Sequence, residues 1–144
     1  MKKILLSLIL LFPALIAGAQ GPIKLWNDQL DKFITVFNEV EPALNQLYSD
    51  NGISVFAFTY YDPESGDVIK EASVFDSDAF GKINDDLMAK AREIVVKGLA
   101  SQSGLTPILK EFEKKNTDIV LLYTTESDGK KLTKQVKIAP SEIK

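Results

Sequence analysis

Hydrophobic side chains along residues 26–47 recur at alternating spacings of four and three. This period is typical of one stripe of an amphipathic helix, and Asn27 or Asp28 would cap its start. Pro42 lies within the stripe, and proline cannot donate to the helix ladder. We therefore expect a break near Glu41 and a short second helix that ends at about Ser49. The stripe consists of Trp26, Leu30, Phe33, Phe37, Val40, Leu44 and Leu47.

Two segments of aromatic and β-branched residues come next. Residues 53–60 and 68–75 flank a turn that contains glycine, which predicts a hairpin. The sequence "DSD" at 76–78 then predicts the cap of one long helix, whose apolar stripe runs to Leu99. Acid-before-base pairs four residues apart are expected on the polar side of this helix. The pairs are Asp86–Lys90 and Glu93–Lys97.

The rest of the chain repeats this order of elements. Pro107 predicts the start of a second short helix, which we expect to end at Asn116. Strands at about 118–125 and 131–138 follow, with "SDG" between them as a strong hairpin signal. We interpret the order as a possible internal duplication, which a parallel crossover between the halves would contradict. The predicted half-repeats are 22–76 and 77–139.

Strand alternation assigns the side chains to two faces. Phe56, Phe58 and Tyr60 share one side of the first strand, and we expect this side to lie with Leu121 and Tyr123 beneath the helices. The first and third strands are apolar on both sides, so we place them in the middle of the sheet. The predicted fold is α+β: a four-stranded antiparallel sheet of order 2-1-3-4 with two long helices on one face.

The other face of this sheet is the candidate binding site. Two helices cover about one face of a four-stranded sheet, so the second face is expected to stay open. An apolar open face favours a docking surface, although an ordinary solvated sheet face is the alternative. The predicted site residues are Val55, Ala57, Thr59, Tyr61, Val120, Leu122 and Thr124.

Residues 1–19 have the features of a cleaved export signal. Two lysines form a basic start, an apolar run follows, and Ala17 and Ala19 supply the small residues that a signal peptidase reads. The apolar run is shorter than the roughly 20 residues of a membrane span. We therefore predict cleavage after Ala19, a periplasmic or secreted protein, and no membrane attachment once the signal is removed.

The remaining chain, 20–144, has the length of a single α+β domain. It contains no Cys, so its core must stabilise it without disulfides. Removal of the two leader lysines leaves 15 basic residues against 20 acidic ones, which disfavours nucleic acid as a partner. The partners that we predict are a protein, a peptide or an envelope polymer, with a homodimer through the sheet as one possibility.

The residue types restrict the available chemistry. The chain contains neither His nor Cys, which excludes Ser–His and Cys–His nucleophiles and His-based metal sites. The loop "DPESGD" at 62–67 has the residues of a turn and lacks the ending of a calcium loop, so we predict no metal and no cofactor. We favour a non-catalytic binding or assembly module of the bacterial cell envelope. The alternative is a small carboxylate-dependent hydrolase of envelope glycans. Its candidate acids are Asp76, Asp78, Asp85 and Asp86.

Overall fold

The computed structural model describes residues 17–143, with side chains from Asn27 onward. The chain divides into two units, Met1–Lys32 and Phe33–Lys144. In the first unit, residues 17–32 form the beginning of helix α1 (Ala17–Asn38). The predicted export signal lies outside the described residues except for its last three positions. Among the described helices, none has the length and apolarity needed to cross a membrane.

The second unit contains the sheet and the remaining helices. A proline-led helix precedes each of the two hairpins along the chain, as the sequence predicts. The helices are α2 (Glu41–Asp50), α3 (Ser77–Gly81), α4 (Asp85–Ala100), α5 (Thr106–Lys114) and the 3-10 helix η1 (Pro140–Glu142). The strands are β1 (Val55–Asp62), β2 (Asp67–Val74), β3 (Ile119–Ser127) and β4 (Lys130–Ile138).

The helix boundaries follow local signals. Pro42 and Pro107 stand in the first turns of α2 and α5, where a missing backbone donor costs nothing. One boundary was not predicted: the expected long helix is two helices, α3 and α4. Asp76 Oδ1 accepts a 2.9 Å bond from the N–H of Asp78, and Asn84 Oδ1 accepts one of 2.9 Å from that of Leu87. The apolar period continues across this break, which is why periodicity alone did not reveal it.

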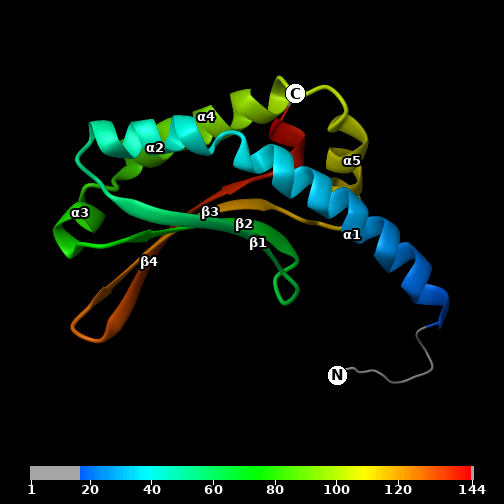
Figure 1. Cartoon of the computed structure of the whole chain (residues 1–144), viewed down its shortest axis with the longest axis horizontal. Helices are drawn as coiled ribbons and strands as arrows, with labels where there is room; N and C mark the ends of the chain where they lie inside the picture. The colour runs from blue at the N-terminus through cyan, green and yellow to red at the C-terminus, as the bar shows by residue number, and fades with distance from the viewer. Residues whose placement is uncertain (1–16, 144) are drawn as a thin grey trace. The chain divides into compact units, whose positions relative to one another are not determined.

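The strand order is β1-β2-β3-β4, so the predicted order 2-1-3-4 is wrong. The sheet is mixed: each hairpin is antiparallel, but β2 and β3 run parallel. This parallel crossover through α3, α4 and α5 contradicts the duplicated sheet arrangement that we expected. The coarser prediction, an α+β fold with a four-stranded sheet, is confirmed. In Figure 1, α2 and α4 lie along one side of the sheet, and both hairpin tips extend away from them.

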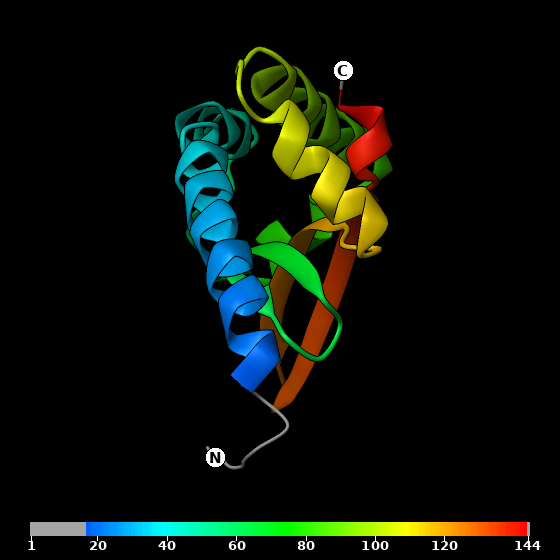
Figure 2. The same ribbon diagram turned by 90° about the vertical axis from the view of Figure 1, so that its right-hand side faces the viewer.

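Registered pairs show which side chains share a face. One row runs across the sheet through Thr59, Lys70, Leu121 and Val136, and the next row on this side contains Ala57, Ala72, Tyr123 and Lys134. Tyr48 of α2 bonds to Tyr123 through their hydroxyls at 2.8 Å, so this side faces the helices. Figure 2 shows the same layers from the end, with α4 and α5 above the strands.

The core forms between this sheet face and the helices. Phe33, Phe37 and Phe112 are fully buried, and the ring centroids of Phe33 and Phe112 lie 4.8 Å apart in an edge-to-face arrangement. Leu121 and Tyr123 pack from the sheet side. Their burial beneath the helices is as predicted, whereas Phe56, Phe58 and Tyr60 lie on the opposite face. That assignment was wrong because the register across β2 places Phe58 in line with Leu122, whereas Leu121 is in line with Thr59.

Candidate binding face

The predicted site residues lie on two different faces. Thr59 pairs with Lys70, and Lys70 pairs with Leu121, which places Thr59 on the helix side. Val120 instead pairs through Ile69 with Tyr60, on the side away from the helices. The helix side therefore holds Val55, Ala57, Thr59 and Tyr61. The other side, which we call the open face because no helix packs on it, holds Val120, Leu122 and Thr124. Of these, Val120 and Thr124 are buried and Leu122 is half-buried. The residues were not brought together because the register across β2 aligns Ala57 with Tyr123 and not with Leu122.

Three aromatic side chains on β1 dominate the open face. Phe56, Phe58 and Tyr60 alternate along the strand, and we call them the aromatic row. Phe56 is 61% exposed and Phe58 is 42% exposed. The centroids of Phe56 and Phe58 are 6.2 Å apart, and those of Phe58 and Tyr60 are 5.4 Å apart with their planes nearly parallel. The row thus presents a continuous apolar strip beside a sheet edge.

Polar groups lie next to the aromatic row. The hydroxyl of Tyr60 donates a 3.0 Å hydrogen bond to Glu71 Oε1. The hydroxyl of Thr124 lies 3.5 Å from Glu71 Oε2 and 3.4 Å from the Ser73 hydroxyl. Burial, followed by the bond to Glu71, raises the pKa of Tyr60 to about 12. Tyr60 therefore stays neutral at physiological pH and remains a hydrogen-bond donor to the carboxylate.

A cleft of about 430 Å³ continues the open face toward the end of β2. Phe75, just past β2, is 73% exposed beside it. The lining combines carboxylates, hydroxyls and one lysine, so the cleft offers both hydrogen-bond donors and acceptors. Its lining residues are Glu71, Ser73, Val74, Phe75, Thr124, Thr125, Glu126 and Lys131.

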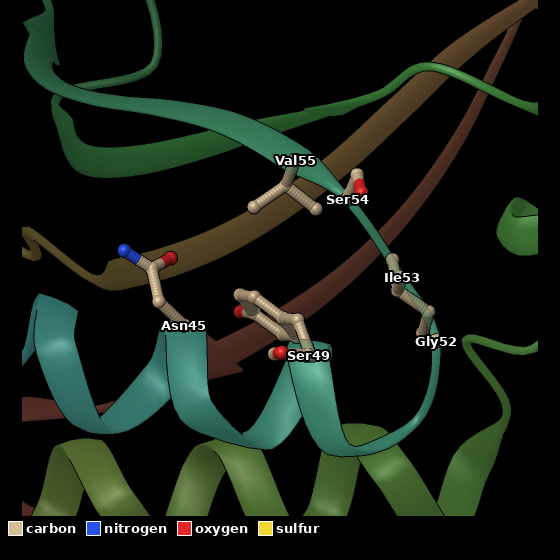
Figure 3. Close-up of a pocket in the computed structure, with 7 residues that line it drawn as sticks. Asn45, Ser49, Gly52, Ile53, Ser54 and Val55 are labelled. Carbon is tan, nitrogen blue, oxygen red and sulfur yellow. The ribbon is translucent and has the colours of Figure 1, made fainter.

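A second pocket, of about 380 Å³, lies between α2 and the start of β1. Figure 3 shows Asn45 and Ser49 of α2 on one side of it and Val55 on the other. Tyr48 lines this pocket but points its hydroxyl at Tyr123. Burial raises the pKa of Tyr48, with the neighbouring Tyr123 adding to the effect. Because the two hydroxyls satisfy each other, this pair is a structural contact of the core.

Two of the four candidate acids of a hydrolase have structural roles, and Asp78 and Asp85 lie in the first turns of α3 and α4. Asp76 caps α3, and Asp86 forms a 3.3 Å ion pair with Lys90 on the exposed side of α4. In the first hairpin turn, Asp62 accepts bonds from the N–H of Glu64 and the hydroxyl of Ser65, each at 3.0 Å. Within the described part of the chain, no three acidic side chains gather as a metal site would require.

Comparison with known proteins gives no family for this chain: no family description, curated protein or solved structure matches it. The candidate site therefore rests on its geometry. Sequence reasoning missed the aromatic row, Glu71 and Ser73 as members of the open face. One signal was present in the sequence, because "VFAFTYYD" at 55–62 contains no basic residue and its aromatic residues alternate.

Proposed function

We propose that this protein is an exported, non-catalytic binding module of the bacterial cell envelope, and that it docks a partner on the open face. The observation that carries the proposal is the exposure of Phe56 and Phe58 on a sheet face that the helices leave uncovered. The features of residues 1–19 support export. Exposed aromatic side chains gathered on one surface mark binding sites more often than isolated ones do.

The polar groups beside the row suit a protein or peptide partner. Aromatic side chains bury large apolar areas at interfaces, and a polar rim fixes the orientation of the partner. Such a rim is supplied by Glu71 and Ser73 on one side of Leu122, and by Gln135 on the other side of Leu122. An extended peptide or an envelope polymer with both apolar and hydroxyl groups would match this surface.

The hydrolase alternative has weaker support. A glycoside hydrolase needs two carboxyl groups that face each other across the substrate, one of them protonated. Asp76 is engaged as a helix cap and Asp86 in an exposed ion pair. Neither lies in the cleft beside Phe75.

Matched charge substitutions test the proposal. The chain 20–144 is immobilised and partners are captured from envelope extract, then each candidate is titrated in purified form. Phe58→Glu is expected to weaken binding by about tenfold or more, because a carboxylate buried without a partner is costly. The control is Leu132→Glu: Leu132 is 41% exposed, against 42% for Phe58, but it pairs with Thr125 on the helix side of β4.

Two results would contradict the proposal. Equal loss of binding in both variants would place the contact outside the open face. The second result is hydrolysis of envelope glycans by the wild-type protein. If a single Asp→Asn change at Asp76, Asp78, Asp85 or Asp86 abolishes this hydrolysis without unfolding the protein, the hydrolase alternative is favoured.

A further inference from the structure

The two edges of the sheet differ in chemistry. Edge strands expose unpaired backbone groups, and soluble proteins protect them with lysine, proline, bulges or short length. The β4 edge reads "KKLTKQVKI" and has four lysines. The β1 edge reads "VFAFTYYD" and has no lysine, arginine or proline, with one acid at its end. By this criterion β4 is protected against pairing and β1 is not.

The β1 edge also has the geometry of a pairing site. In the described sheet β1 has β2 as its only strand neighbour, so no strand of the sheet pairs with its outer side. Its register with β2 runs without a bulge from Val55↔Val74 to Asp62↔Asp67. A regular strand of 8 residues is long enough to accept another strand by backbone hydrogen bonds. The aromatic row stands directly beside this edge.

We propose that β1 pairs antiparallel with β1 of a second copy, so that one sheet continues across a two-fold axis. The inference rests on the proposed function in one respect, because pairing joins the two aromatic rows into a single docking surface. It adds to that function the identity of a partner and the edge by which the partner binds.

The distribution of charge along β1 favours a second copy of the chain as the partner that pairs with this edge. With Phe58 on the axis, Phe58 faces its own copy, Phe56 faces Tyr60, and Asp62 faces Ser54. The aromatic rows then meet on one face, which is a favourable cross-strand arrangement. The Asp62 carboxylates lie at opposite ends of the paired strands, so no like charges are opposed. The side chains of β1 are therefore compatible with antiparallel pairing to β1 of a second copy.

The same pairing is unfavourable at β4. With Lys134 on the axis, Lys134 would face its own copy and Lys131 would face Lys137. Like charges directly opposite each other destabilise a strand pair. Pairing of β1 with β4 would be head-to-tail and would leave free edges for further addition, whereas the β1 pair closes after two copies. Of the possible pairings of the β1 and β4 edges, the closed β1–β1 dimer is therefore the favoured one.

Sedimentation velocity on the chain 20–144, from micromolar to millimolar concentration, tests this pairing. The wild type is expected to dimerise, and Phe58→Lys is expected to weaken dimerisation by about tenfold or more, since two ammonium groups would meet on the axis. Leu132→Lys, at matched exposure on the protected edge, should dimerise as the wild type does. Circular dichroism melts verify folding, and Phe56→Lys replaces Phe58→Lys if the latter fails to fold.

A mixing experiment tests the two-fold axis itself. Phe58→Lys and Phe58→Glu should each be monomeric alone and should form a heterodimer when mixed, because opposite charges then face each other. A wild type that is monomeric at millimolar concentration overturns the inference, as does a dimer that Phe58→Lys leaves intact. A monomer that still binds its envelope partner through Phe58 would overturn the dimer alone. A dimer with no other partner would instead contradict the proposed function.

Discussion

Lys70 provides the sharpest test of how this fold is stabilised. Its side chain is 3% exposed, and its ammonium donates a 2.6 Å bond to Glu41 Oε1 at the start of α2. It also donates to Asn38 Oδ1 at 3.3 Å and to the Thr59 hydroxyl at 3.1 Å. The ammonium lies 5.8 Å from the ring centroid of Phe37. Lys70 thus joins the α1–α2 break to the sheet.

The two members of the ion pair, Lys70 and Glu41, differ in their exposure to water, and the prediction rests on this difference. The Glu41 side chain is 35% exposed, so its carboxylate reaches water without Lys70. Glu41 is also the first residue of α2, where the helix dipole stabilises a negative charge. Lys70 has no comparable alternative, because it is buried. Removal of the carboxylate therefore leaves a buried cation with neutral acceptors only, whereas removal of the cation leaves a solvated anion.

The magnitudes follow from this difference. Loss of one partner of a fully buried ion pair costs about 3–5 kcal/mol. The bonds to Asn38 and Thr59 remain in Glu41→Gln, so we expect a loss of about 2–3 kcal/mol. Lys70→Met keeps the apolar stem and removes the desolvated charge, and we expect a loss of about 0–1 kcal/mol. In the double variant the buried cation is gone, so its stability should match that of Lys70→Met.

Urea unfolding followed by circular dichroism measures these changes. With a slope of about 1–3 kcal/mol/M, the Glu41→Gln loss corresponds to a decrease of about 1–2 M in the unfolding midpoint. The double variant is the control for simple additivity. If Lys70→Met costs more than Glu41→Gln, the ion pair contributes through its net attraction. If the double variant loses the sum of both single losses, the two side chains have no energetic coupling. Either result would show that the buried cation is not the source of the asymmetry.

Three further predictions concern the core. Tyr123→Phe leaves the buried Tyr48 hydroxyl without its 2.8 Å partner and should cost about 1–3 kcal/mol in urea unfolding, most of which Tyr48→Phe in the same chain recovers. Burial raises the pKa of Tyr123 to about 12, so the unfolded chain loses this proton first and melting temperature should fall as pH rises from about 10 to about 12. Gly98→Ala should destabilise the protein by about 1–3 kcal/mol, because the new Cβ would lie 2.5 Å from Val40 Cγ1. Gly81→Ala is the control: its Cβ would have no atom within 4 Å, so it should not lower the melting temperature.

Local structure could be predicted from the sequence because its signals are local. Pro42 ends α1 where expected, and both acid-before-base pairs of α4 form, with Lys97 2.9 Å from Glu93. The second hairpin turn is also as predicted: Asp128 and Gly129 both have positive φ, at 54° and 75°. This is the conformation that an Asp–Gly turn favours.

Strand order could not be predicted, because it depends on tertiary partners of polar side chains. Lys70 and Glu71 make β2 look like an exposed edge strand. Lys70 is instead buried against Glu41, and Glu71 accepts hydrogen bonds from Tyr60 and Thr124. Asp67 accepts a 3.0 Å bond from the N–H of Asp118 at the start of β3. A strand whose polar groups are satisfied in this way can lie at the centre of a sheet.

Folding does not account for the whole aromatic row of β1. Tyr60 has a structural role, since its hydroxyl binds Glu71 and its ring stacks on Phe58. Phe56, at 61% exposure, contributes little apolar burial, and a threonine would suit an exposed edge strand equally well. Folding therefore accounts for Tyr60, in part for Phe58, and not for Phe56. An apolar side chain left in water is stabilised when a second surface covers it, and the pairing proposed at the β1 edge would bring such a surface to Phe56.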